Sequence, residues 1–232
     1  MGLRIGGLVP FTTTDFPGRL AAVVFCQGCP WRCGYCHNPH LQAPHAETGL
    51  ESLAWPSIID WLTTRRGLLD GVVFSGGEPT AQPELAQAID AVRAQGFAVG
   101  LHTAGIYPRR LAAIAHALAW VGLDIKAPLT TYPAITGIAG SGSVAFASLH
   151  VLQDAKVPFE VRTTVHAVLT PRRALVSLAA ALADEGVTEW VLQPFRSAGC
   201  ADPALVSTAD ARPLTPDLLD DLRAHVPDVI VR

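Results

Sequence analysis

Six short apolar runs, separated by segments with helical periodicity, constrain the fold of this chain more than any other feature of its sequence. The runs cover residues 20–25, 71–75, 97–102, 120–126, 159–165 and 189–195. Continuous apolar runs, as opposed to strict alternation of apolar and polar residues, are typical of parallel strands buried on both faces. The sequence therefore predicts a parallel sheet covered by helices.

The segments between these runs carry start and stop signals of helices. Thr80 is expected to cap a helix that ends at Gly96. The buried face of that helix would carry Leu85, Ile89 and Val92. Proline opens two more predicted helices, one at Pro108 and one at residues 170–171, and the second ends at Gly186. Weaker helical patterns cover residues 52–66, 143–155 and 216–224, and residues 229–232 predict a terminal strand.

Repeated strand–helix units imply right-handed crossovers between parallel strands. Six units are fewer than the eight of a complete barrel, which typically needs about 250 residues. The count predicts an α/β fold, a partial (β/α)6 TIM-like barrel in a single domain. A flat doubly wound sheet is the alternative that periodicity leaves open. We expect residues 20–196 to form the core, residues 1–19 an N-terminal extension, and residues 197–232 a C-terminal extension packed on the barrel.

Composition excludes several classes of protein. Half of the 232 residues are hydrophobic, only 16% are charged, and the formal net charge is −3. The chain has no run rich in Lys or Arg, so we expect no nucleic-acid partner. The longest apolar stretch, residues 111–123, is shorter than the roughly 20 residues of a membrane span. The N-terminus lacks a signal-peptide pattern, so we expect a cytoplasmic protein without a membrane partner.

Four of the five cysteines crowd into residues 26–36. In a cytoplasmic protein such crowding indicates metal or redox chemistry, as opposed to a disulfide framework. Cys29, Cys33 and Cys36 have the spacing CxxxCxxC directly after a predicted strand. Most [4Fe–4S] clusters take four cysteine ligands, so three close cysteines leave one iron open to another ligand.

Cys26 leaves two alternatives open. It can be a buried thiol at the end of a strand, or it can be a fourth ligand that closes the cluster. A structural zinc site formed by all four cysteines is a further alternative. Zinc folds usually place a dozen or more residues between two CxxC pairs, and only three residues separate the pairs here. The spacing therefore favours iron–sulfur chemistry.

The residues around the cysteines resemble a known family. CxxxCxxC with Tyr35 before the third cysteine resembles the signature of the radical S-adenosylmethionine (SAM) superfamily. The segments TTTDFPG (residues 12–18) and QGCPWRCGYCHNP (residues 27–39) resemble the activating proteins of anaerobic ribonucleoside-triphosphate reductase, which are glycyl-radical enzyme activases. The resemblance extends from residue 7 to residue 232. It implies a [4Fe–4S] cluster held by Cys29, Cys33 and Cys36, with SAM bound to the open iron.

Two loops after predicted strands are expected to contact SAM. In SGGEP, Gly76 and Gly77 let the backbone approach a ligand closely, and Glu78 can accept hydrogen bonds from an ammonium group. The resemblance implies that this loop holds the amino group of SAM. In LHTAG, Thr103 is a further expected contact. Ala104 stands where the family usually has Asn, so no side-chain contact is expected there.

Further polar residues sit at the ends of later strands. Asp124 and Lys126, at positions i and i+2, are expected to share one strand face at the mouth of the barrel. In the activases this motif contacts polar parts of SAM. Arg162 in an apolar run needs a partner, which can be the SAM carboxylate or an internal acid. Gln193 is expected to flank the adenosine, and Tyr35 completes the predicted cofactor-binding set.

The resemblance implies a reaction. Enzymes of this kind reductively cleave SAM to a 5′-deoxyadenosyl radical, and an activase uses it to generate a glycyl radical on a partner enzyme. The expected partners are anaerobic ribonucleoside-triphosphate reductase and a flavodoxin- or ferredoxin-type electron donor. One alternative is a radical SAM enzyme acting on a small biosynthetic molecule. Another is a non-catalytic zinc- or cluster-binding interaction protein. His37 is expected to support the cluster without ligating it, and Cys200 is expected to be incidental.

Overall fold

The computed structural model describes residues 2–45, 53–209 and 213–232. Within these residues eight strands follow one another in chain order, from β1 to β8, in a mostly parallel α/β sheet. The chain forms two compact units. Unit 1 comprises Met1–Pro30, His40–Gly122 and Ala147–Phe159, and unit 2 comprises Trp31–Pro39, Leu123–Phe146 and Glu160–Arg232.

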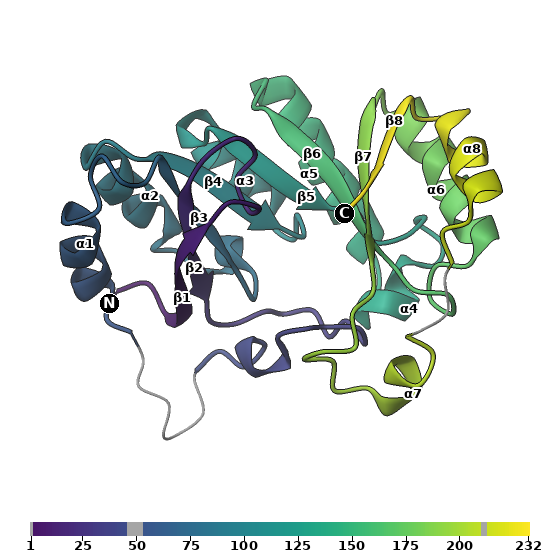
Figure 1. Cartoon of the computed structure of the whole chain (residues 1–232), viewed down its shortest axis with the longest axis horizontal. Helices are drawn as coiled ribbons and strands as arrows, with labels where there is room; N and C mark the ends of the chain where they lie inside the picture. The colour runs from purple at the N-terminus through teal and green to yellow at the C-terminus, as the bar shows by residue number, and fades with distance from the viewer. Residues whose placement is uncertain (1, 46–52, 210–212) are drawn as a thin grey trace. The chain divides into compact units, whose positions relative to one another are not determined.

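The sheet of unit 1 explains why two motif-bearing loops meet. Its strands are β1 (Ile5–Thr12), β2 (Ala21–Cys26), β3 (Gly71–Gly76) and β4 (Ala98–Thr103) (Figure 1). β2, β3 and β4 are parallel, and β1 is antiparallel to β2. The register of β2 on β3 makes Cys26 the partner of Gly76. The loop with the cysteines and the SGGEP loop therefore leave the sheet side by side.

The core of unit 1 lies against these strands. Val23 of β2 and Val73 of β3 are buried against Phe16 and Trp120, whose rings stack with their centroids 6.0 Å apart. The helices are α1 (Trp55–Thr63), α2 (Leu85–Ala94), α3 (Pro108–Ile114) and α5 (Ser141–Ala155), the last of which continues from unit 2. Proline occupies the first turn of α1 and α3, where the missing N–H costs no hydrogen bond.

Unit 2 carries the later strands and helices. The strands are β5 (Trp120–Asp124) and β6 (Phe159–Val165), whose first residues belong to unit 1, with β7 (Glu189–Pro194) and β8 (Asp228–Val231). β6, β7 and β8 are parallel. The helices are α4 (Tyr132–Thr136), α6 (Arg172–Asp184), α7 (Pro203–Val206) and α8 (Pro216–Arg223).

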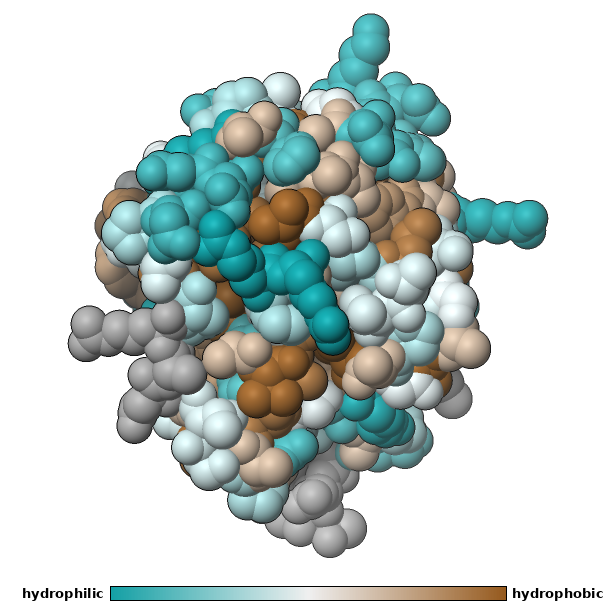
Figure 2. Space-filling model, turned by 90° about the vertical axis from the view of Figure 1, so that its right-hand side faces the viewer, coloured by the Kyte–Doolittle hydropathy of each residue, from teal (hydrophilic) through white to brown (hydrophobic). Residues whose placement is uncertain are grey.

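Helices α6 and α8 lie side by side (Figure 1). Arg172 of α6 pairs with Asp217 of α8 at 2.6 Å and also with Asp221. Figure 2 faces this side of unit 2 and shows hydrophilic residues over much of it, with hydrophobic patches between them. The ion pairs are exposed, so we assign them little stabilising free energy.

The predicted strands are confirmed. The six apolar runs form β2 to β7, and the expected terminal strand is β8. Strand β5 ends at Asp124, so the prediction that Lys126 lies within this strand is wrong. Strand β1 was not predicted, because it falls in the expected N-terminal extension. Most of its residues are at least partly exposed, which removes the burial pattern that reveals a strand.

Most predicted helices are confirmed, with one correction. Thr80 does not cap α2; it lies in a 3₁₀-helix (Pro79–Ala81), and α2 begins at Leu85. The backbone N–H and hydroxyl of Thr80 both donate to Glu78 instead. The short helices α4 and α7 were not predicted. The predicted helix over 52–66 is observed as Trp55–Thr63, and residue 52 lies outside the described residues.

Within the described ranges, every helix is too short or too polar to cross a membrane. The predicted boundaries between extensions and core, at residues 19/20 and 196/197, stay predictions.

Candidate cluster and cofactor site

The four clustered cysteines follow strand β2. Cys26 is its last residue and lies in unit 1 with Cys29, whereas Cys33 and Cys36 lie in unit 2. A turn joins the last two, because the Cys36 N–H donates to the Cys33 carbonyl at 3.1 Å. All five cysteines belong to the described part of the chain, and none forms a disulfide.

The three predicted ligands have the donor chemistry of a cluster site. Cys29, Cys33 and Cys36 are partly exposed. Burial raises the pKa of Cys33 above its ordinary value, and the nearby Lys126 ammonium offsets this only in part. A cation therefore lies close to this thiol. Soft thiolates in this number suit an iron–sulfur cluster. Among the described residues no three His, Cys, Asp or Glu are grouped as metal ligands, so the assignment stays a prediction.

Cys26 differs from the other three. Its side chain is 0% exposed. Burial, helped by the nearby Glu78 carboxylate, raises the pKa of the Cys26 thiol far above its ordinary value. The Cys26 side chain is less accessible to a cluster than those of Cys29, Cys33 and Cys36, which favours a buried thiol over a fourth ligand.

Glu78 is a buried carboxylate that accepts four hydrogen bonds from the protein. It is 0% exposed. One oxygen accepts from the Thr80 N–H (3.0 Å), the Thr80 hydroxyl (2.6 Å) and the Thr103 hydroxyl (2.7 Å). The other oxygen accepts from the Ala104 N–H at 2.9 Å. The prediction that Glu78 accepts from the SAM ammonium stays a prediction, and groups of the protein already occupy both oxygens.

These hydrogen bonds connect the LHTAG loop to the SGGEP loop at Glu78, and we call this group of contacts the Glu78 joint. Thr103 donates to Glu78, and its hydroxyl also accepts from the Gly105 N–H at 3.0 Å. Ser148 of α5 donates to the Gly105 carbonyl at 2.8 Å and anchors the far side of the loop. At position 104, where the family has Asn, the backbone supplies the contact. The substitution to Ala is therefore compatible with this joint.

Gly76 and Gly77 allow the backbone of residues 25–28 to approach closely, whereas their predicted approach to a ligand stays a prediction. A Cβ at Gly76, whose φ is 107°, would lie 2.5 Å from the Cys26 nitrogen. A Cβ at Gly77 would lie 2.4 Å from the Gly28 carbonyl oxygen. The N–H groups of Gly77 and Glu78 donate to the carbonyls of Cys26 and Gly28 at 2.9 Å. The two loops are thus locked together without ligand.

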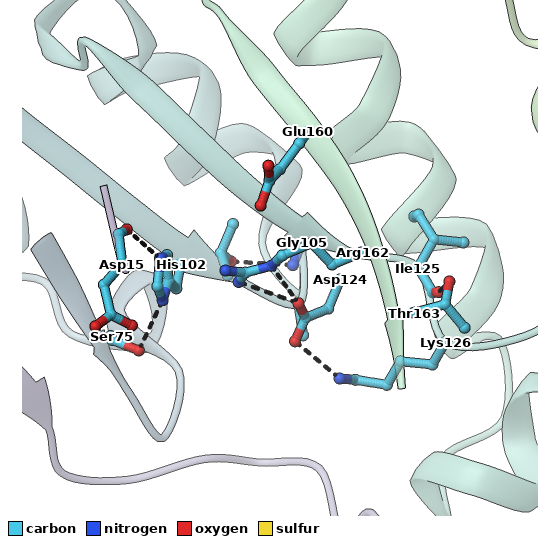
Figure 3. Close-up of polar contacts among 12 residues, drawn as sticks. Asp15, Ser75, His102, Gly105, Asp124, Ile125, Lys126, Glu160, Arg162 and Thr163 are labelled. Atoms are coloured by element: carbon cyan, nitrogen blue, oxygen red, sulfur yellow. Dashed lines mark hydrogen bonds and ion pairs between the residues drawn. The ribbon is translucent and has the colours of Figure 1, made fainter. Parts of the chain in front are cut away.

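In unit 2, two cations converge on Asp124. Arg162 Nε donates to one carboxylate oxygen at 3.1 Å, and Nη2 lies 3.1 Å from the same oxygen. Lys126 Nζ lies 3.2 Å from the other oxygen. Figure 3 shows both side chains pointing at Asp124. Lys126 and Arg162 are only 7% and 8% exposed. Of the two predicted partners of Arg162, the internal acid is therefore observed.

Lys126 also contacts the segment that carries the cysteines. Its ammonium lies over the Tyr35 ring, 5.6 Å from the centroid. Burial alone lowers the pKa of Lys126, but Tyr35, Asp124 and Cys33 outweigh burial, so its pKa is well above the ordinary value. Lys126 is therefore a permanent cation beside Cys33 and Asp124. Because β5 ends at Asp124, the predicted shared strand face is not observed, but the Lys126 side chain still pairs with Asp124.

Tyr132 of α4 was missed by the sequence analysis. Its hydroxyl accepts from the Lys126 N–H at 3.2 Å and lies 3.3 Å from the Asp124 carbonyl, to which it donates. Trp31 packs edge-on against its ring at 5.8 Å. Tyr132 thus fixes the backbone between the two charged residues. A tyrosine eight positions after an acid has no sequence signal for this role.

A second missed group surrounds His102 in unit 1 (Figure 3). His102 Nε2 lies 2.9 Å from the Asp15 carbonyl, and Nδ1 lies 3.3 Å from the Ser75 hydroxyl. The ring packs edge-on against Trp120. Asp15 belongs to TTTDFPG, so this motif is joined to the ends of β3 and β4.

The remaining predicted residues lie on the later part of unit 2. Gln193 is half-buried near the end of β7 and is paired in register with Thr164. Phe195 follows that strand, and its ring packs against two histidine rings, with centroid distances of 5.5 Å to His37 and 4.8 Å to His166. Burial lowers the pKa of His37, which favours a neutral ring. The supporting role of His37 stays a prediction.

The C-terminal segment touches the residues around the last two cysteines. Cys200 Sγ lies 3.5 Å from the Gly34 carbonyl oxygen. A Cβ at Gly199 would lie 2.3 Å from the His37 carbonyl oxygen. The expectation that Cys200 is incidental stays a prediction. Its thiol nevertheless lies beside Gly34, between Cys33 and Cys36 in the sequence.

The fold and these loops define the class. Residues 23–178 match the Radical SAM superfamily, and the chain belongs to this superfamily of enzymes. Enzymes of the superfamily use a [4Fe–4S] cluster and SAM.

Sequence relatives narrow the comparison. A Methanocaldococcus jannaschii protein, named as a glycyl-radical enzyme activating enzyme, is 30% identical over 57% of this chain and 54% of its own. The pyruvate formate-lyase-activating enzyme of Clostridium pasteurianum is 32% identical over 72% of this chain and 70% of its own. The PqqA peptide cyclase of Rhodopseudomonas palustris is 30% identical over 60% and 37%. The chain thus spans about half the length of the first of these relatives.

Solved structures confirm the predicted fold. A radical SAM methyltransferase from Sphaerobacter thermophilus matches with a TM-score of 0.66, 15% identity, and coverage of 96% of this chain and 68% of that one. Streptococcus suis SuiB bound to S-adenosylmethionine matches with a TM-score of 0.61, 9% identity, and coverage of 89% and 48%. At such identities the match shows the fold alone, a partial barrel of the radical SAM type.

Proposed function

We propose that this protein is an activase that reductively cleaves SAM and generates a glycyl radical on a partner enzyme, anaerobic ribonucleoside-triphosphate reductase. The observation that carries the proposal is the 32% identity to the C. pasteurianum activating enzyme, which covers 70% of that enzyme. The M. jannaschii relative carries a name from the same reaction class. The choice of reductase rests on the resemblance of residues 12–18 and 27–39.

The two cations that pair with Asp124 suit the anionic end of SAM. When bound, the cluster and SAM together supply one-electron cleavage of a carbon–sulfur bond and a radical able to remove hydrogen from a C–H bond. The Lys126 ammonium has three N–H donors, and Asp124 accepts one at 3.2 Å. Lys126 and Arg162 share the single carboxylate of Asp124, so the three groups carry one net positive charge. In a buried site this net charge attracts the carboxylate of a ligand more strongly than it would in water. We assign Lys126 and Arg162 to the SAM carboxylate.

The joint around Glu78 suits a second role. It holds the loops after β3 and β4 to each other and to the backbone that precedes Cys29. SAM has to meet both the cluster and the polar loops in one orientation. A joint that is complete without ligand keeps these loops in place before SAM arrives.

The proposal is tested by anaerobic cluster reconstitution followed by EPR, with and without SAM. We expect the cluster spectrum to change on addition of SAM, because SAM binds the open iron. With the reductase and a flavodoxin- or ferredoxin-type donor present, we expect a glycyl radical signal and release of 5′-deoxyadenosine. Rapid SAM cleavage without a glycyl radical on the reductase contradicts the proposal. Zinc without sulfide in the purified chain would support the non-catalytic alternative.

Modification of a peptide or small molecule is the second candidate. It is favoured by the PqqA peptide cyclase relative. Mass spectrometry of the substrate separates the two, because a cyclase leaves a new covalent bond, whereas an activase leaves a radical on an otherwise intact chain. The electron donor and the cytoplasmic location stay predictions.

A further inference from the structure

Gln27 stands between Cys26 and Cys29, yet neither the cluster nor SAM gives it a role. It is 2% exposed, directly after strand β2. Its backbone N–H donates to the Arg4 carbonyl at 2.9 Å, which ties it to the segment before β1. A buried amide is stable only when its polar atoms find partners, so the contacts of the side chain need an explanation.

The side chain of Gln27 closes the segment that carries the ligands. Nε2 donates to the His40 carbonyl at 2.9 Å and to the Ala43 carbonyl at 2.8 Å. Two backbone bonds run beside these contacts, from the Gly28 N–H to the Leu41 carbonyl (2.8 Å) and from the Cys29 N–H to the Gln42 carbonyl (3.1 Å). The first predicted ligand, Cys29, is therefore hydrogen-bonded to the returning segment of its own loop, residues 40–43.

A second buried glutamine holds the first. Gln82 Oε1 accepts from the Arg4 N–H at 2.7 Å, and Nε2 donates to the Arg4 carbonyl at 2.7 Å and to the Gln27 carbonyl at 3.2 Å. Gln82 follows the 3₁₀-helix that begins directly after Glu78. The two glutamines therefore join the segment before β1, the start of the cysteine loop and the SGGEP loop.

The backbone of β1 leaves room for this arrangement. A Cβ at Gly6 would lie 2.6 Å from Gln27 Oε1 and 2.2 Å from Leu41 Cδ2. Any side chain at position 6 would therefore displace the Gln27 amide or the returning segment. The backbone at Gly6 and the side chain of Leu41, which are far apart in sequence, therefore both pack closely around the Gln27 amide.

We propose that Gln27 is a positioning residue for the cluster, which closes the ligand loop before iron and sulfide arrive. Ordering a loop costs conformational entropy. If hydrogen bonds already order the loop in the apoprotein, this entropy is not lost when the cluster binds, and the cluster binds more tightly. Gln27 touches no ligand atom and acts through Gly28, Cys29 and the returning residues 40–43. The inference rests on the cluster used by the superfamily and is independent of the partner enzyme.

The test compares Gln27→Met with Gln95→Met. Methionine keeps the length of glutamine and removes both donors. Gln95 is the matched control, because its Nε2 also joins distant segments of unit 1, donating to the Ile59 carbonyl at 3.0 Å, away from the cysteines. In the apoprotein we expect amide exchange at Gly28 and Cys29 to be roughly tenfold faster in Gln27→Met. In the reconstituted protein we expect the cluster to pass to a chelator roughly tenfold faster. Gln95→Met should change neither rate.

Two outcomes overturn the inference. One is faster exchange at Gly28 and Cys29 with unchanged release of the cluster, which would make Gln27 a purely structural residue. The other is equal acceleration of cluster release in Gln95→Met, which would make the effect one of general stability. If Gln27→Met does not fold, Gly6→Ala replaces it, because its Cβ displaces the same amide, and the same two rates decide. A wild-type chain that holds its cluster but leaves the reductase without a radical refutes the proposed function only.

Discussion

Two carboxylates at strand ends, Glu78 in unit 1 and Asp124 in unit 2, have opposite surroundings. Glu78 is fully buried and accepts from hydroxyls and backbone N–H groups, all neutral donors. Asp124 is partly exposed and is paired with two cations. Both residues were predicted as SAM contacts on the same sequence grounds. Their environments indicate that Glu78 organises the backbone of the loops and that Asp124 positions two cations, which we propose bind SAM.

Replacing Glu78 by alanine should have the largest effect. The N–H groups of Thr80 and Ala104 would lose a buried acceptor, and we expect unfolding free energy to fall by about 4 kcal/mol. Chemical denaturation of the apoprotein measures the change. Asp90→Ala is the control, since Asp90 is an exposed carboxylate of α2 in the same unit, and it should leave stability unchanged. A loss below about 1 kcal/mol would show that the joint is not needed for the fold.

The second prediction concerns close packing in unit 2. Gly199 and Gly186 both have positive φ, 83° and 72°. A Cβ at Gly199 meets the His37 carbonyl at 2.3 Å, whereas a Cβ at Gly186 has nothing within 4 Å. Gly186→Ala should therefore cost only the backbone strain, about 1 kcal/mol, and Gly199→Ala about 2 kcal/mol more. Equal losses of unfolding free energy in the two variants would mean that the segment around Gly199 moves away from His37 at no cost.

The third prediction sharpens the ligand role of unit 2. Lys126→Met should weaken SAM binding about tenfold, equivalent to about 1.4 kcal/mol, because it removes a buried cation from the SAM carboxylate. Isothermal titration of the reconstituted protein measures the affinity. Arg172→Met is the control, since Arg172 is an exposed cation paired with Asp217 and Asp221. Unchanged affinity in Lys126→Met would remove Lys126 from the SAM site.

The smallest expected effect is a pH dependence that follows from the burial of Glu78. Burial raises the pKa of Glu78, and hydrogen bonds from Thr80, Thr103 and Ala104 offset this only in part. A raised pKa means that the folded state binds the proton more tightly than the unfolded state. The stabilisation is complete below the unfolded pKa, near 4.5, and is lost as pH rises through the folded pKa.

Denaturation at a series of pH values tests this sign. Relative to Glu78→Gln, the wild type should lose stability as pH rises from about 4 towards neutrality. A difference that stays constant, or grows in the opposite direction, would indicate that hydrogen bonds dominate over burial at Glu78.

Local sequence patterns were enough to predict strands β2 to β8, most of the longer helices, their order along the chain, and the family. Each depends on local information: apolar runs such as residues 159–165, proline at helix starts, and the spacing of Cys29, Cys33 and Cys36. These features can be read from the sequence because the pattern of a buried strand and the spacing of ligands in a loop involve residues that are close along the chain.

The roles of the polar side chains, by contrast, follow from contacts that form only when the chain is folded. The sequence around Thr80 resembles a helix cap, yet in the structure Thr80 donates two hydrogen bonds to Glu78. Arg162 finds Asp124, 38 residues earlier, because two strands place them together. Gln27 and Gln82 form one network across 55 residues. A polar group takes whichever partner the packing brings within about 3 Å, and packing depends on contacts between segments that no local pattern encodes.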